Sequence, residues 1–277
     1  MMNLDSIMSL VRTAAREELL PRFNKVDSEF KADGSFLTEA DLAMQTRLTH
    51  ELQQQWPQIL MLGEEMDAQE QDALLHNGKP LWILDPLDGT SNYAAGIPFF
   101  SVSLALIEEG ELQLGVVYDP ARDECFSARR GQGSWLNGRR LAPVETGLSL
   151  KQSTGLIDFK RLSPQLATRL AVEIPYSSQR SFGSVALDWC WIAAGRCHVY
   201  LHGKQNLWDY AAGALILSEA GGQACTLDGE AVFNHSLTPR SAVAALDKTL
   251  FGEWTEWLGI EYTRDTDFHS SDPCAGL

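Results

Sequence analysis

The chain has 277 residues, of which 44% are hydrophobic and 21% are charged, and its formal net charge is −15. The composition is ordinary for a globular protein. The acidic balance argues against nucleic acid or an anionic membrane as the main partner, because phosphate groups are bound through Lys and Arg. A phosphorylated ligand would need positive charge from bound divalent cations.

Cysteine usage and the apolar stretches indicate the compartment. The five cysteines are scattered and form no Cys-x-x-Cys pair, which is typical of reduced residues in an intracellular protein rather than of a disulfide framework or a zinc site. The N-terminal residues show an amphipathic helix pattern and not a signal-peptide core. No apolar stretch approaches the ~20 residues that span a bilayer. We therefore expect a cytoplasmic protein.

The elements expected along the chain mix helices with a strand meander. After the N-terminal helix, Thr38 to Asp41 open a second helix with a capping box. Strands are expected at 59–62, 81–84, 100–107, 112–118, 125–128 and 199–201, with those between 100 and 128 as an antiparallel meander. Further helices are expected from Ser163-Pro164, over 184–194, and from Trp208 to Gly221. This mixture predicts a layered α/β sandwich.

The segment 144–151 is the best candidate for a boundary. It predicts an N-terminal α+β part, 1–147, and a C-terminal α/β part, 148–262. The remaining residues, 263–277, have a polar, turn-forming composition and are expected to be a disordered tail.

The most informative segment runs from Trp82 to Thr90. An apolar run ends on Asp85, and Asp-Pro-x-Asp suits a type I turn that would hold Asp85 and Asp88 within ~7 Å. Two facing carboxylates repel each other unless a proton or a cation lies between them. Gly89 and Thr90 follow at an expected helix start, where backbone N–H groups favour an anion.

Carboxylates at element boundaries recur elsewhere, at Asp41, Glu64 and Asp209. Oxygen ligands without His or Cys favour Mg²⁺ or Mn²⁺ over zinc. A cluster of such ligands can hold two cations ~3.5–4 Å apart, which is the spacing for attack of water on a phosphoryl group.

Each acid also has a simpler interpretation. Asp41 could be only the capping-box acid, and Asp209 could be a helix N-cap. Asp85 and Asp88 could form a plain Asp-Pro turn, and Glu64 could be a surface acid. None of these interpretations explains why all four segments occur in one chain.

Several motifs together resemble the inositol monophosphatase family over roughly residues 5–260. These motifs are Lys31-Ala32-Asp33-Gly34-Ser35 through Thr38 and Asp41, Gly63-Glu64-Glu65, Asp85-Pro86-Leu87-Asp88-Gly89-Thr90-Ser91-Asn92-Tyr93, Gly115 to Pro120, and Trp208-Asp209-Tyr210-Ala211-Ala212-Gly213 through Gly222. The resemblance implies a Mg²⁺-dependent, lithium-sensitive phosphomonoesterase with an α-β-α-β-α sandwich like that of inositol monophosphatase and fructose-1,6-bisphosphatase, commonly a homodimer. Two or three Mg²⁺ ions are implied per site, with Mn²⁺ as the alternative.

The resemblance also implies metal ligands. Glu64, Asp85 and the backbone carbonyl of Leu87 would hold the first ion. Asp85, Asp88 and Asp209 would hold the second.

It further implies roles in catalysis. Asp41 would lie near a weaker third ion and hydrogen-bond Thr90. Thr90 and Glu64 would orient the attacking water, and the N–H groups of Gly89 and Thr90 would receive the phosphate. Asp209 would face the leaving group.

The substrate pocket is expected to include Gly183, Ser184 and Val185. His202 falls where inositol-cleaving members carry a Glu that binds sugar hydroxyls, and this departure weighs against myo-inositol 1-phosphate. His202 is either a surface loop residue or, with Lys204, a contact for a polar or additionally anionic substrate.

These observations predict a phosphatase that acts on a small phosphate monoester, with inositol monophosphate as the default substrate. Alternatives within the family are histidinol phosphate, fructose 1,6-bisphosphate and 3′-phosphoadenosine 5′-phosphate. An alternative of another class is a regulatory protein that keeps this fold and binds protein partners.

Overall fold

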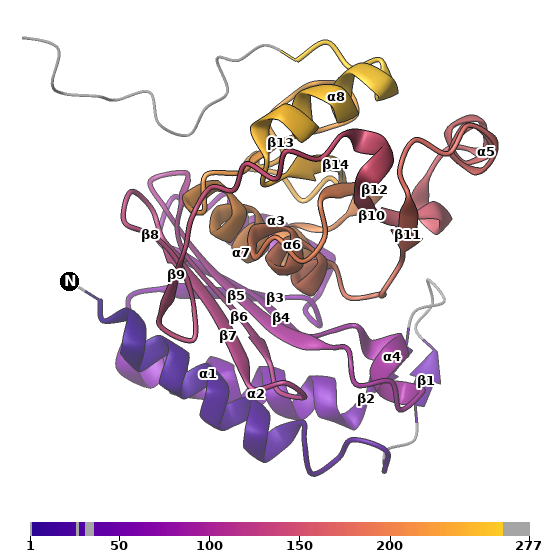
Figure 1. Ribbon diagram of the computed structural model, residues 1–277. Coiled ribbons are helices and arrows are strands. Elements are labelled where there is room, and N and C mark those ends of the chain that lie inside the picture. Colours follow the sequence, from indigo (N-terminus) through magenta and orange to yellow (C-terminus); the bar gives the residue numbers. More distant parts are fainter. Residues whose placement is uncertain (1, 26–27, 31–35, 263–277) are drawn as a thin grey trace, which may run out of the picture.

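The computed structural model describes residues 2–25, 28–30 and 36–262 (Figure 1). The segment Lys31 to Ser35 and the expected tail 263–277 lie outside the described residues. No helix in the described ranges combines the length and the apolar character that crossing a membrane requires.

A seven-stranded sheet forms the first half of the fold. Its strands, in spatial order, are β3 (Leu60–Gly63), β4 (Leu81–Asp88), β5 (Ser101–Glu108), β6 (Glu111–Asp119), β7 (Glu124–Arg129), β8 (Gly133–Leu136) and β9 (Arg139–Leu141). β3 and β4 are parallel, and every later neighbour pair is antiparallel. The expected meander over β5, β6 and β7 is confirmed, because short turns at Gly110 and at Asp119-Pro120 return the chain directly to its neighbour.

A five-stranded sheet forms the second half, after the connecting segment 142–149. Its spatial order is β11 (Ser178–Arg180), β10 (Thr154–Asp158), β12 (Val199–Gln205), β14 (Arg240–Ala245) and β13 (Gln223–Cys225). A separate hairpin joins β1 (Ser28–Phe30) to β2 (Phe36–Thr38). The division of the chain into two domains at 147/148 stays a prediction.

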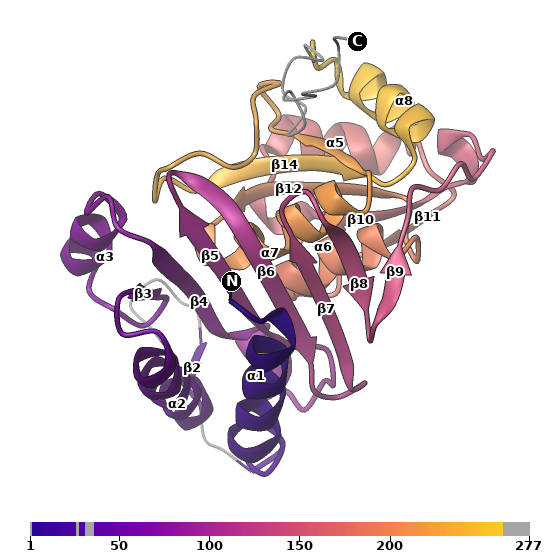
Figure 2. The same ribbon diagram turned by 90° about the vertical axis from the view of Figure 1, so that its left-hand side faces the viewer.

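Helices cover and separate the two sheets (Figures 1 and 2). The outer face of the seven-stranded sheet carries α1 (Leu4–Glu18) and α2 (Glu39–Gln55), the space between the sheets holds α6 (Val185–Ala193) and α7 (Leu207–Glu219), and the far face of the five-stranded sheet carries α5 (Pro164–Val172) and α8 (Lys248–Leu258). Shorter elements are α3 (Ala68–Leu75), α4 (Thr90–Ala94) and the 3₁₀ turns η1 (Leu150–Gln152) and η2 (Phe159–Arg161). The predicted α-β-α-β-α layering is confirmed.

Close packing of α7 against its neighbours sets the depth of the central layer. A Cβ atom added at Gly115 of β6 would lie 2.8 Å from the carbonyl oxygen of Ala212, and one added at Gly213 would lie 2.5 Å from Cβ of Trp189 on α6. The two glycines therefore let α7 approach both the sheet and α6 more closely than any larger residue would allow.

We expect Gly115→Ala to lower the free energy of unfolding by about 1–3 kcal/mol, because the new methyl group meets backbone atoms that cannot rotate away. Urea denaturation of the purified protein measures this. Gly252→Ala is the matched control, since a Cβ there meets no atom within 4 Å and alanine favours helix α8. Equal stability of the two variants would contradict the close approach of α7.

Candidate active site

The parallel pairing of β3 with β4 brings two acids to one edge of the sheet. Gly63 is the register partner of Leu84, and the N–H of Glu64 donates to the carbonyl oxygen of Leu84 at 3.1 Å. Glu64 and Asp85 follow directly after these partners, so both lie at the point where the pairing of the two strands ends.

The structure corrects the expected strand end at Leu84. β4 continues through Asp88, with a register shift on β5 between Asp85, opposite Ser103, and Asp88, opposite Ser101. Pro86 has no N–H to give to the ladder, and a bulge accommodates it where the sequence suggested a turn. The N–H of Leu87 donates to Oδ1 of Asp85 at 3.0 Å.

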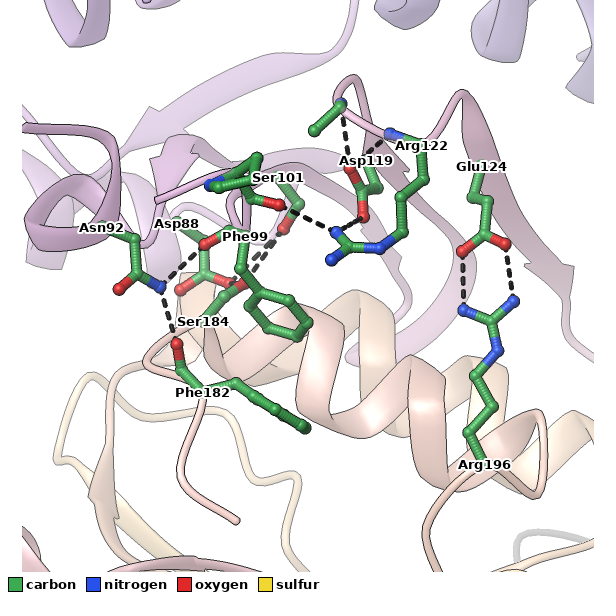
Figure 3. A network of polar contacts seen from close by, with 12 residues as sticks. Asp88, Asn92, Phe99, Ser101, Asp119, Arg122, Glu124, Phe182, Ser184 and Arg196 are labelled. Atoms are coloured by element: carbon green, nitrogen blue, oxygen red, sulfur yellow. Dashed lines mark hydrogen bonds and ion pairs between the residues drawn. The ribbon is translucent and has the colours of Figure 1, made fainter. Parts of the chain in front are cut away.

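Asp88, the last residue of β4, points its carboxylate at the first residues of α6 (Figure 3). Its carboxylate accepts hydrogen bonds from Oγ of Ser184, from the N–H of Val185 at 3.1 Å and from the N–H of Ala186 at 2.8 Å. Oγ of Ser101 also donates to it, at 3.4 Å. A carboxylate at a helix N-terminus is stabilised by the orphan N–H groups and by the helix dipole.

Asp209 approaches from α7. Asn206 is the N-cap of this helix, and Asp209 completes a capping box by accepting from the N–H of Asn206 at 2.7 Å. The simpler interpretation of Asp209 as an N-cap is therefore wrong. Oγ of Ser103 donates to the carbonyl oxygen of Trp208 at 3.0 Å, which fixes the start of α7 beside the strand position opposite Asp85.

The four acids influence one another electrostatically. Burial, followed by the charges of Glu64, Asp88 and Asp209, raises the pKa of Asp85 well above its usual value. Burial, Glu64 and Asp88 likewise raise the pKa of Asp209. Burial also raises the pKa of Asp88, although the hydrogen bonds from Ser184 and α6 oppose the rise. Segments distant in sequence thus converge on one region of negative charge.

A group of buried and half-buried carboxylates, whose charges raise the pKa of Asp85 and Asp209, fits a divalent cation, because a cation removes the repulsion. An all-oxygen ligand set favours Mg²⁺ or Mn²⁺. Within the described ranges, no three acidic, His or Cys side chains are already grouped closely enough to hold one ion. Asp85, Asp88 and Asp209 are instead turned toward backbone and hydroxyl donors, so the site fits a cation by its chemistry and would have to close around it.

Thr90 links the site to α2. Its hydroxyl lies 3.1 Å from Oδ1 of Asp41 and 2.9 Å from the carbonyl oxygen of Leu87. The expected hydrogen bond between Asp41 and Thr90 is therefore present. Asp41 also completes the predicted capping box, since its Oδ2 accepts from the N–H of Thr38 at 2.7 Å.

Gly89 is required at the turn between β4 and α4. Its φ is +93°, and a Cβ there would lie 3.0 Å from the carbonyl oxygen of Phe99 and 3.3 Å from that of Gly183. Backbone from both halves of the chain, at Phe99 and at Gly183, therefore packs against this turn and leaves no room for a side chain.

His202 lies inside β12 and is 4% exposed, so the interpretation as a surface loop residue is wrong. Its Nε2 lies 2.8 Å from Oδ2 of Asp158, its register partner on β10, and its Nδ1 accepts from the N–H of Lys204 at 3.2 Å. Both ring nitrogens are thus used within the protein.

Sequence reasoning missed the residues that hold the acids in place. Ser101 and Ser103 are the buried polar positions of a strand that is otherwise apolar up to the exposed Glu108 at its end, and this exception was the available signal. Asn92 joins the two halves, because its Nδ2 donates to the carbonyl oxygens of Phe99 at 2.8 Å and Phe182 at 2.6 Å (Figure 3). No local pattern could indicate a contact between residues so far apart.

Comparison with known proteins identifies the family to which this combination of fold and acidic site belongs. The solved structure of the IMPase of Thermotoga maritima superposes with a TM-score of 0.78 and 30% identity, covering 92% of this chain and 99% of that one. The fold is therefore that of the IMPase and SuhB structures. The profile of the Inositol monophosphatase family matches residues 3–257, and the chain belongs to this family.

Two curated relatives show the range of names in the family. The Nus factor SuhB of Xylella fastidiosa is 34% identical over 231 residues, covering 81% of this chain and 82% of the relative. The fructose-1,6-bisphosphatase/inositol-1-monophosphatase of Thermotoga maritima is 33% identical over 233 residues, covering 82% and 86%.

Replacing Asp85 with its neutral isostere should stabilise the protein in the presence of a chelator. Folding raises the pKa of Asp85, so the protonated or neutral form favours the folded state, and this advantage is lost as the pH rises through the folded-state pKa. At neutral pH we expect Asp85→Asn to raise the free energy of unfolding by about 1.4 kcal/mol for each unit by which folding raises the pKa of Asp85. Thermal unfolding with EDTA measures this.

Asp247→Asn is the control of opposite sign. Asp247 caps α8 and accepts from the N–H groups of Thr249 and Thr146. These bonds outweigh burial and lower its pKa, so its replacement should destabilise the protein. A loss of stability in both variants would contradict the repulsion inferred at Asp85.

Proposed function

We propose that this protein is a metal-dependent phosphatase that hydrolyses a phosphate monoester of a small alcohol, with inositol monophosphate as the default substrate. Membership of the inositol monophosphatase family supports the reaction class. The observation that carries the proposal is the convergence of Glu64, Asp85, Asp88 and Asp209 from three separate segments of the chain. The charges of Glu64 and Asp88 raise the pKa of both Asp85 and Asp209.

The proposed cofactor is Mg²⁺, two or three ions per site, with Mn²⁺ as the alternative. Glu64, Asp85 and the carbonyl oxygen of Leu87 would hold one ion, and Asp85, Asp88 and Asp209 another. When bound, the ions supply a more acidic water and neutralise charge that develops on the phosphoryl oxygens. Because the chain carries a net charge of −15, it needs this local positive charge to admit a phosphate.

The remaining roles are those that the family resemblance implies. The hydrogen bonds of the Thr90 hydroxyl to Asp41 and Leu87 support one of them, in which Thr90 would orient the attacking water together with Glu64. The N–H groups of Gly89 and Thr90 would receive the phosphate, and Asp41 would lie beside a weaker third ion. Asp209 would face the leaving group.

The proposed substrate pocket contains Gly183, Ser184, Val185 and His202. Ser184 and Val185 contact Asp88 directly, which places this loop beside the carboxylates. His202 would contact the substrate through the face of its ring, because Asp158 and Lys204 engage both ring nitrogens. Histidinol phosphate, fructose 1,6-bisphosphate and 3′-phosphoadenosine 5′-phosphate remain the alternative substrates. A cytoplasmic homodimer whose main partner is neither nucleic acid nor a membrane is also part of the proposal.

A regulatory role is the second candidate, because SuhB relatives carry the name Nus factor. Capture of a stoichiometric protein partner, with cellular function retained by the Asp88→Asn variant, would favour it. The complete acidic set argues for turnover, because a module that only binds partners needs no such set.

Asp88→Asn and Asp209→Asn should each lower kcat by at least about a hundredfold while the fold persists, because each removes one charge from the proposed metal site. Phosphate release from inositol 1-phosphate at saturating Mg²⁺ measures kcat, and circular dichroism checks folding. Glu70→Gln is the control, an exposed acid on α3 outside the cluster. Near-normal rates in either Asp variant would contradict the ligand assignment.

Lithium should inhibit the reaction, as the family resemblance implies. We expect Li⁺ to reduce phosphate release in a dose-dependent way at fixed Mg²⁺, whereas Na⁺ at the same ionic strength should have little effect. Equal responses to the two cations would remove lithium sensitivity from the proposal.

A further inference from the structure

Two exposed histidines from the two halves of the chain meet at the surface, away from the acidic cluster. His76 is the C-cap of α3, and His235 lies in the loop 226–239 between β13 and β14. The centroids of their rings are 6.1 Å apart, and the planes of the rings meet at 74°. Both side chains are open to solvent, so a dissolved ion can reach them.

The core beneath the two rings anchors both segments. Leu74, near the end of α3, packs against the central hydrophobic cluster, and so do Phe233 and Leu237, which flank His235 in the loop. The contact between His76 and His235 therefore rests on segments that share one core, although they lie far apart in the sequence.

Asp72 fixes the tautomer of His76. Nδ1 of the ring lies 2.9 Å from the carbonyl oxygen of Asp72 and 3.4 Å from its Oδ1. Both oxygens only accept, so Nδ1 donates, and Nε2 of the neutral ring keeps a free lone pair. Histidines that bind metals almost always hold their second ring nitrogen in this way. Among the described residues, neither Nε2 of His76 nor a ring nitrogen of His235 takes part in a hydrogen bond.

The local electrostatics favour a cation at this point. His76 lies at the C-terminus of α3, where the helix dipole is negative, and the carboxylate of Asp72 adds a further negative charge. Partial burial, followed by the charge of His76, lowers the pKa of His235. Its ring is therefore neutral at neutral pH, which is the form that binds a metal.

We propose that His76 and His235 bind one transition-metal ion, with Zn²⁺ as the representative ion, and so cross-link α3 to the loop before β14. Imidazole nitrogens suit Zn²⁺, Ni²⁺ and Cu²⁺, whereas Mg²⁺ takes oxygen ligands. This site therefore differs in chemistry from the acidic cluster.

The spacing of the rings fits a shared ion. Two imidazoles bound to one Zn²⁺ at the tetrahedral angle have ring centroids about 5 Å apart, so small rotations of the exposed side chains close the observed 6.1 Å. In the part of the chain that the structure describes, no third acidic, His or Cys side chain is grouped with the pair closely enough to act as a ligand. Water would complete the coordination.

The cross-link bears on the acidic site through α3. Gln71 on this helix is 5% exposed, and its Nε2 donates to the carbonyl oxygens of Gly63 at 2.8 Å and of Glu64 at 3.2 Å. A metal ion between His76 and His235 would hold the helix that supports the backbone of Glu64, and it would do so from outside the acidic cluster.

Calorimetric titration of Zn²⁺ into the full-length protein tests the site, with Mg²⁺ in excess to occupy the acidic cluster. We expect His76→Gln and His235→Gln each to weaken one Zn²⁺-binding event of the wild-type protein by at least about tenfold, because each removes a ligand. His50→Gln is the matched control, since it removes another exposed histidine, from α2, and should keep that event. No Zn²⁺ binding by the wild-type protein, or unchanged binding in His76→Gln, would overturn the proposal.

Hydrogen exchange followed by mass spectrometry tests the cross-link itself. We expect Zn²⁺ to slow amide exchange in both α3 and the loop 226–239 of the wild-type protein, and in neither segment of His76→Gln. Circular dichroism confirms that each variant is folded. Slower exchange in only one segment, or in both segments of His76→Gln, would contradict a shared ion. Neither measurement depends on turnover, so the result stands whether or not the proposed phosphatase activity is found.

Discussion

Repulsion among buried carboxylates is the constraint on which the site depends. Asp85 is 2% exposed and Asp88 is 7% exposed, so water cannot screen their charges as it screens surface acids. The protein reduces this cost locally by turning Asp88 toward the start of α6 and Asp209 toward Asn206. These bonds are individually modest, and they leave the cluster with an excess of negative charge that a divalent cation would neutralise.

The surrounding layers hold these acids together against their repulsion. Parallel pairing fixes Glu64 beside Asp85, and the contact of Gly115 with Ala212 lets α7 come close enough to bring Asp209 to the same edge. Asn92 then joins the β4–α4 segment to the loop before α6 through two carbonyl oxygens. The acids thus come from segments that pack as one core, so the acidic site is formed by the same contacts that stabilise the fold.

Local sequence patterns predicted the parts of this arrangement that depend on neighbouring residues. The capping box at Thr38 and Asp41, the β5–β7 meander and the start of α5 at Ser163-Pro164 are present. The continuation of β4 past Pro86 was missed, because a bulge is fixed by the partner strand and leaves no signal distinct from a turn. Most short strands, such as β11 and β13, were missed because three residues show no alternation.

Contacts between segments that are distant in sequence could not be predicted from local patterns. The expected proximity of Asp209 and Asp85 came from family resemblance, since no periodicity links residues in β4 and α7. Ser184 was expected only in the substrate pocket, yet its hydroxyl binds Asp88 from 96 positions away in sequence. The burial of His202 likewise depends on β10, which supplies Asp158 and is joined to β12 only through tertiary structure.

The arginines that pack against α6 are paired with acids outside the cluster. Arg122 is bound to Asp119 at 2.8 Å and Arg196 to Glu124 at 2.6 Å (Figure 3). Both guanidinium groups also lie over the ring of Trp191 on α6. Their charges are therefore used in holding α6 against β6 and β7. In a chain with a net charge of −15, these two engaged guanidinium groups do not offset the charge of Asp85, Asp88 and Asp209. A divalent cation held by the acids would supply the positive charge that an anionic ligand needs there.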